Sequence, residues 1–95
     1  MNIIINKSNA EGKTYTAVID NKNSIHFGAK NYSDFTIHKD PERKKAYLAR
    51  HKHDKSTNPL YAGFYASNLL WNKPTLRESI KNTNDKYNVN IKLKI

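Results

Sequence analysis

Cysteine is absent from this chain of 95 residues, and glycine and proline occur only three times each. Without cysteine the chain has no disulfide, no thiolate metal ligand and no cysteine nucleophile. Because small secreted domains usually depend on disulfides, we expect a reducing compartment. Gly12, Gly28 and Gly63 are too far apart for a phosphate-cradling loop, and the sequence has no Gly-x-Ser-x-Gly or His-Glu-x-x-His motif.

Long hydrophobic runs are also missing. The apolar stretch near the start covers only Ile3 to Ile5 before the sequence turns polar, which is too short for the apolar region of a signal peptide. No stretch approaches the ~20 apolar residues that cross a membrane. A chain of this length is predicted to form one small domain, residues 1–95, which excludes a multidomain enzyme and a membrane protein.

Acidic residues are scarce. The 8 Asp and Glu face 17 Lys and Arg, which gives a formal net charge of +9. Of the basic residues 14 are lysines, whose codons are AT-rich, so we expect part of this excess to reflect coding bias. The charge is uneven along the chain: residues 1–38 carry a net +1 and residues 39–95 carry +8. A polyanionic partner is therefore expected to contact the C-terminal part.

Alternating apolar and polar residues predict the strands. Lys13–Asp20 and Ser24–Gly28 are joined by asparagine-rich turn residues and predict a hairpin. Ile3–Asn6 is expected to add a short strand. Val89–Ile95 alternates with polar positions and predicts a C-terminal strand with one wet, basic face.

Helix signals lie between these strands. Asp40 before Pro41 is a typical helix start and predicts a helix to about His53, with Tyr47 and Leu48 facing inward. Residues 62–71 form the most apolar stretch and favour a short buried helix. Residues 75–78 (Thr-Leu-Arg-Glu) are a capping box that predicts a third helix to about residue 85. The fold class is therefore α+β: a small antiparallel sheet, made of the hairpin and the C-terminal strand, packed with two or three helices.

The basic helix is the main functional candidate, because a nucleic-acid backbone rewards clustered cations without demanding a fixed geometry. The alternative is a solvated, solubilising helix face. Most aromatic residues are expected to form the core, Trp71 among them, and exposed ones would be able to stack on bases. The residues predicted to contact a polyanion are Lys39, Arg43, Lys44, Arg50, Lys52, Lys73 and Arg77.

Metal binding and catalysis find less support in the sequence. His51 and His53 lie two positions apart and would point to different faces of a helix, so we interpret them as exposed histidines rather than ligands. No catalytic residue, metal site or cofactor is predicted.

The layout of a hairpin, a basic helix with an arginine and a later glutamate resembles that of GIY-YIG nucleases. His26–Gly28 stands where the second signature triplet of that family falls, Arg43 where its helix arginine falls, and Glu78 where a metal-binding glutamate falls. The sequence departs from the pattern because no Gly-Ile-Tyr-like triplet surrounds Tyr15 and Phe27 lacks a hydroxyl. The resemblance implies at most a degenerate nuclease.

Four segments, taken together, also resemble a family of small basic proteins of unknown function from nucleocytoplasmic large DNA viruses, giant viruses among them. They are His26–Thr36, His38–Lys44, Tyr47–His51 and Leu69–Leu76. The resemblance implies a viral protein of the host-cell cytoplasm or viral factory, or one packaged in the virion, with no catalytic residues to carry over.

Two non-enzymatic hypotheses follow. The first is a virion-associated basic protein that binds DNA, RNA or another polyanion through phosphate contacts without sequence specificity. The alternative is a minor capsid or cement protein whose lysines pair with acidic capsid surfaces. The first predicts a steep dependence of affinity on salt, and the second a shallower one.

Overall fold

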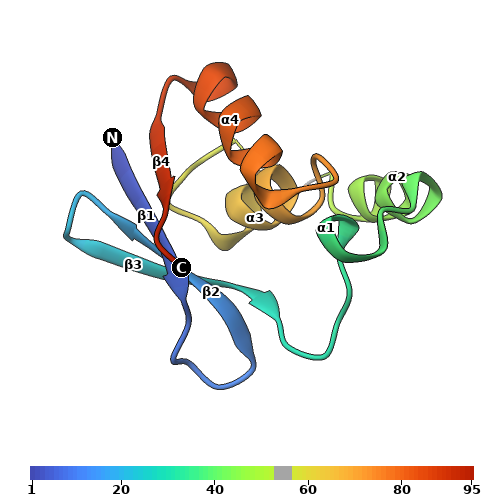
Figure 1. Cartoon of the computed structure of the whole chain (residues 1–95), viewed down its shortest axis with the longest axis horizontal. Coiled ribbons are helices and arrows are strands. Elements are labelled where there is room, and N and C mark those ends of the chain that lie inside the picture. Colours follow the sequence, from blue (N-terminus) through green and yellow to red (C-terminus); the bar gives the residue numbers. More distant parts are fainter. Residues whose placement is uncertain (53–56) are drawn as a thin grey trace.

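The computed structural model describes residues 1–52 and 57–95, and these form a sheet with helices on one side (Figure 1). In chain order the elements are β1 (Asn2–Lys7), β2 (Lys13–Ile19), β3 (Asn23–Ala29), α1 (Phe35–His38), α2 (Pro41–Arg50), α3 (Ala62–Tyr65), the π-helix η1 (Ala66–Leu70), α4 (Leu76–Tyr87) and β4 (Asn90–Leu93). The predicted α+β class is confirmed.

The sheet is mixed, with strand order β3-β2-β1-β4. β1 pairs antiparallel with β2, and β2 pairs antiparallel with β3, as the hairpin pattern predicts. β4 returns to the sheet but runs parallel to β1, with Ile3 opposite Ile91. The expectation of a wholly antiparallel sheet is therefore wrong for this pair. The chain between the two strands crosses over through the helices, and such a crossover is what parallel pairing needs.

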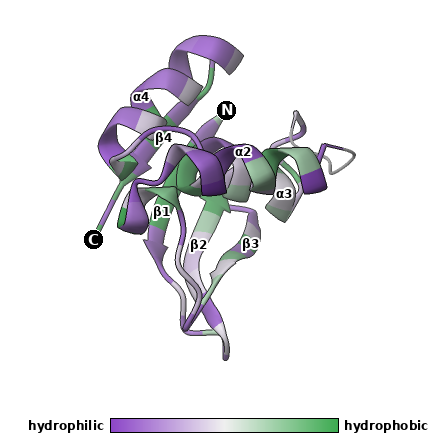
Figure 2. Ribbon diagram, turned by 90° about the vertical axis from the view of Figure 1, so that its right-hand side faces the viewer, coloured by the Kyte–Doolittle hydropathy of each residue, from purple (hydrophilic) through white to green (hydrophobic). Residues whose placement is uncertain are grey.

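The core lies between one face of the sheet and the segment α3–η1–α4. Side chains of the strands, such as Ile3, Ile5 and Phe27, pack against Phe64 and Tyr65 of α3. All five are buried. In Figure 2 the hydrophobic colouring is concentrated on the strands, whereas α4 is mainly hydrophilic. The sheet and α3 therefore supply most of the apolar burial that stabilises so small a domain.

The apolar stretch at residues 62–71 is helical, as predicted, but it changes type within its length. α3 passes into the π-helix η1, where the Trp71 N–H donates to Ala66 O at 3.1 Å, an i→i+5 hydrogen bond. A π-helical turn inserts one extra residue per turn. Leu70 is buried in the core while Trp71 is only half-buried and reaches α2. Such turns are rare and concentrate at functional sites.

Helix α2 begins where the sequence predicts and ends earlier. Asp40 caps it by accepting from the Glu42 N–H at 3.0 Å, and Pro41 occupies its first turn. The helix ends at Arg50 instead of near His53, which lies outside the described residues. No residue of α2 is buried, and Leu48 is 38% exposed, so the predicted inward stripe is reduced to Tyr47. Figure 1 shows α2 at the end of the molecule away from the sheet.

Helix α4 follows its predicted cap. Thr75 Oγ1 accepts from the Glu78 N–H at 3.2 Å and donates to the Glu78 carboxylate at 3.0 Å. The helix extends to Tyr87, and Asn88 ends it in the left-handed conformation (φ 54°) before β4. Across residues 1–52 and 57–95, no helix combines the length and the apolar character that a membrane span requires.

Candidate functional site

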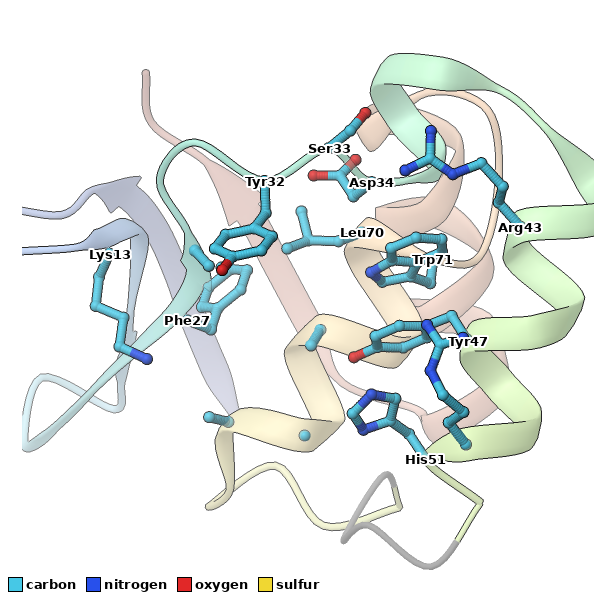
Figure 3. A pocket seen from close by; sticks show the side chains of 16 residues that line it. Lys13, Phe27, Tyr32, Ser33, Asp34, Arg43, Tyr47, His51, Leu70 and Trp71 are labelled. Carbon is cyan, nitrogen blue, oxygen red and sulfur yellow. The ribbon is translucent and has the colours of Figure 1, made fainter.

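A groove of about 520 Å³ opens between the end of β3, helix α2 and η1 (Figure 3). This volume falls in the range of small-molecule sites, about 300–1,000 Å³. We call it the main groove. Its lining includes Lys13, Phe27, Gly28, Tyr32, Asp34, Arg43, Tyr47, Arg50, His51, Leu70 and Trp71. The lining residues lie far apart in the sequence, and they include parts of all four segments that carry the viral resemblance.

Stacked rings form one wall of the main groove. The ring of Tyr47 lies parallel to that of Trp71 (centroids 4.2 Å apart, 2° between planes) and stacks on His51 at 4.2 Å. His38 meets Trp71 at 5.2 Å. We call these four residues the aromatic ladder. Offset-stacked aromatic pairs contribute about 0.5–1.5 kcal/mol beyond their buried area, so the ladder attaches α2 to the rest of the domain. Trp71 thus has the structural role predicted for it and also lines the groove.

Tyr32 lies at the opposite side of the main groove. Its ring is 77% exposed, and Figure 3 shows it facing Leu70 and Trp71 across the cavity. The turn that carries it is fixed by two backbone hydrogen bonds, from Tyr32 N to Ala29 O and from Lys30 N to Gly12 O. The general expectation that aromatics fill the core holds for Phe27 and Phe64 but not for Tyr32.

The floor of the main groove depends on Gly28, which has a φ of +78°. A Cβ at this position would lie 3.1 Å from Thr14 Cβ and 3.3 Å from Leu70 Cδ1. The positive φ strains any other residue here, and Thr14 and Leu70 leave little room for a Cβ. At this point η1 packs against β3.

The charge of the main groove is predominantly positive. Lys13, Arg43 and Arg50 line it, and Asp34 is the one acidic residue in its described lining. Asp34 is engaged locally: its carboxylate caps α1 by accepting from the Thr36 N–H at 2.9 Å and also from the Thr36 hydroxyl. The groove therefore offers cations at its edges and aromatic rings between them.

A second, smaller cationic groove of about 230 Å³ lies on the other side of the aromatic ladder. Lys44, Lys52 and Lys86 line it together with several asparagines, and its described lining includes no acidic residue. Partial burial, and then the nearby charge of Lys73, lower the pKa of the Lys44 ammonium. That ammonium also lies 5.1 Å from the centre of the Phe35 ring.

The seven predicted contact residues fall into four groups. Arg43 and Arg50 line the main groove, and Lys44 and Lys52 line the second groove, with Lys73 near Lys44. Lys39 serves the fold instead, because its Nζ donates to Thr36 O at 2.8 Å and to Pro74 O at 2.9 Å.

Arg77 lies apart, in a hollow between α4 and β4 that Lys81, Lys92 and Asp85 also line. Lys13 and Lys86 are not among the predicted contact residues, and nothing in their local sequence separates them from other surface lysines. Tyr32 is one of the aromatic residues interleaved with the basic ones, which are expected to stack on bases where they are exposed.

The structure also places the residues of the nuclease layout. Phe27, Gly28 and Arg43 line the main groove together. Glu78 is exposed and hydrogen-bonds to Thr75, and it is not part of the described lining. Within residues 1–52 and 57–95 no group of three His, Asp or Glu side chains is arranged to hold a metal ion; His53 and Asp54 of the histidine-rich segment lie outside these residues.

Comparison with known proteins gives one match. The sequence model of a family described as "Family of unknown function (DUF5754)" matches residues 3–51, just over half of the chain. The matched region runs from β1 through α2, and so contains Tyr32, Arg43, Tyr47 and Arg50 but not Trp71. No curated protein and no solved structure matches the chain.

Proposed function

Because the chain belongs to the DUF5754 family of unknown function, we propose a role from its surface: it binds nucleic acid through backbone phosphates, without sequence specificity, and does not act as an enzyme. The single observation that carries this proposal is the placement of α2 between two cationic grooves. Arg43 and Arg50 belong to one, and Lys44 and Lys52 to the other. A polyanion that crosses α2 would contact both sets.

Carboxylates are few in the lining of the two grooves. Asp34, which caps α1, is the one acidic residue in their described lining, against six lysines and arginines. Asp40, which caps α2 through the Glu42 N–H at 3.0 Å, and Glu42 itself are not in that lining. The two grooves therefore carry a net positive charge that attracts an external anion. Clusters of this kind bind phosphates by releasing condensed counterions, which requires no exact geometry.

The proposal is tested by measuring binding of a duplex DNA of mixed sequence to the full chain over a range of salt concentrations. We expect log K to fall linearly with log salt, with a slope of about −0.9 for each phosphate contacted. Absence of binding at ~50 mM salt, where phosphate contacts are strong, would refute the proposal. A shallow salt dependence with tight binding to an acidic protein would favour the capsid hypothesis in its place.

Two arginine variants make a matched pair for this experiment. Arg43→Gln removes a cation from the main groove and is expected to reduce the salt slope by about one. Arg77→Gln removes the same charge from the hollow between α4 and β4 and is expected to leave the slope unchanged. An equal reduction of the salt slope in both variants would show that net charge, and not the two grooves, determines binding.

A further inference from the structure

The main groove contains a slot between the exposed ring of Tyr32 and the stacked rings of the aromatic ladder. Phosphate binding alone does not use this slot. Tyr32 forms one side and the aromatic ladder the other, with Leu70 and Phe27 at the bottom (Figure 3). Leu70 and Phe27 are buried, whereas the Tyr32 ring is 77% exposed. An exposed tyrosine beside an apolar floor is the arrangement on which an unpaired base stacks.

We infer that the main groove binds single-stranded nucleic acid, with one base placed on the Tyr32 ring and the flanking phosphates on Lys13 and Arg43. This inference rests on the proposed function and names the class of nucleic acid. A volume of about 520 Å³ suits a group the size of a nucleotide. In a duplex the bases are paired and stacked inside the helix, and reaching one costs the energy of unstacking it.

The charges around the slot fit a base flanked by phosphates. Lys13 and Arg43 are drawn on opposite sides of the cavity in Figure 3, with Tyr32 and Leu70 between them. Asp34 lies between Tyr32 and Arg43 in the same view and is the one acidic side chain in the described lining. The cations thus lie at the edges of the groove, and the uncharged base takes the middle, on Tyr32.

The backbone turn that carries Tyr32 is formed before any ligand binds. Asn31 adopts the left-handed conformation (φ 70°), and the hydrogen bond from Tyr32 N to Ala29 O at 3.3 Å closes the turn. On the other side the aromatic ladder fixes α2 through the parallel stack of Tyr47 on Trp71. Because this turn and the aromatic wall are preformed, binding loses less backbone entropy than it would with an unformed loop.

The test compares three probes on the full chain: a short oligothymidine, an abasic oligomer with the same number of phosphates, and a duplex of the same length. Trp71 is the only tryptophan of the sequence and lines the main groove, so its fluorescence reports on occupancy directly. We expect oligothymidine to quench this fluorescence and to bind about tenfold more tightly than the abasic oligomer, the fold-change expected for stacking of one base.

Variants at Tyr32 identify the stacking ring. Tyr32→Ala is expected to lower the affinity for oligothymidine to that of the abasic oligomer, while Tyr32→Phe keeps the ring and restores it. Ile37→Ala is the control, because Ile37 is also an exposed apolar side chain, at 66%, but is not in the described lining of the main groove. It is expected to change neither affinity.

The outcomes separate the two proposals. Equal, salt-dependent affinities for oligothymidine and the abasic oligomer would overturn the single-strand inference and leave phosphate binding in place. Tighter binding of the duplex than of oligothymidine would overturn it as well. If none of the three probes binds at low salt, the proposed function itself fails.

Discussion

The sheet side of the molecule and helix α2 differ in the contacts that stabilise them. Ile3, Ile5 and Phe64 are fully buried between the sheet and the helices that cover it, whereas α2 has no buried residue. The stack of Tyr47 on Trp71 attaches α2 to the rest of the domain. Helix α2 is also the element that carries Arg43 and Arg50. The difference teaches that the buried core and the cations of α2 occupy separate parts of this chain, although the floor of the main groove is formed by the core residues Phe27 and Leu70.

The largest expected effect is on the sheet side. Phe64 is fully buried and meets the rings of Tyr65 and Tyr87, each with centroids 5.0 Å away. Phe64→Ala is expected to lower the free energy of unfolding by about 3–5 kcal/mol, because it loses apolar burial and leaves a cavity. Urea unfolding followed by circular dichroism measures this, with the exposed Ile37→Ala as the control, expected within about 0.5 kcal/mol of the parent chain. A small loss at Phe64 would contradict the division between the two regions.

A smaller and more local effect on stability is expected where Tyr47 of α2 stacks on Trp71. Tyr47→Ala removes the ring that stacks on Trp71 and His51, an interaction of about 0.5–1.5 kcal/mol beyond its buried area. Because α2 has no buried residue, its amides should exchange with solvent faster while the strand amides keep their protection. Hydrogen exchange followed by NMR distinguishes this from a uniform loss. Faster exchange in β1 and β2 as well would show that α2 supports the core after all.

The Tyr65 phenol makes the stability of the folded protein depend on pH. Its hydroxyl donates to Pro59 O at 2.7 Å, and burial raises the pKa of this phenol. The folded protein therefore holds a proton that an unfolded tyrosine loses near pH 10. This contribution to stability is fully present below that pH and is lost as the pH rises above it.

The matching variant is Tyr65→Phe. At neutral pH it is expected to lower the free energy of unfolding by about 1 kcal/mol, the contribution of one hydrogen bond. Above about pH 10 the difference from the parent chain should shrink, and urea midpoints on both sides of that pH measure it. The variant should still lose some stability at alkaline pH, because burial, together with the charge of Asp34, raises the pKa of Tyr15 as well. A difference that grows with pH would contradict this assignment.

The smallest expected effect on stability belongs to the arginines of α2. Arg43 and Arg50 are exposed, so the double variant Arg43→Gln, Arg50→Gln is expected to change the free energy of unfolding by less than about 0.5 kcal/mol. The same variant should weaken binding to DNA at low salt by removing two phosphate contacts. A stability loss as large as the binding loss, measured on the same preparation, would mean that the two regions are not separable.

The parts of the fold that the sequence predicts are those with local signals. The hairpin of β2 and β3 follows from alternation around an asparagine-rich turn, and the starts of α2 and α4 follow from Asp40 and Thr75 as caps. The parallel pairing of β4 with β1 has no such signal. Apolar and polar residues alternate around Ile91 in the same way whether the strand pairs parallel or antiparallel. The π-helical turn and the four-residue helix α1 were also missed, since neither has a distinctive periodicity.

The candidate site was predicted in part for the same reason. Arg43, Arg50, Lys44 and Lys52 lie on or next to one helix, so a charge count along the chain finds them. Lys13 and Tyr32 join the site only through the packing of β3 against η1, which is a tertiary contact. Lys39 has the same charge as its neighbours, but its position at the end of α1 turns it toward backbone carbonyls. The viral origin and virion location implied by the resemblance stay predictions, because the family match carries neither.

The position of β1 in the strand order has a consequence for synthesis on the ribosome. β1 is synthesised well before β4, yet β4 is one of its two neighbours, with Asn2 opposite Asn90. Until residues 90–93 have been translated, one edge of β1 has no partner strand within this chain, and Ile3 and Ile5 lack the Ile91 and Leu93 side chains beside them. The nascent chain thus carries an exposed, isoleucine-rich strand edge until β4 has been made. Completion of the sheet therefore waits for the synthesis of β4.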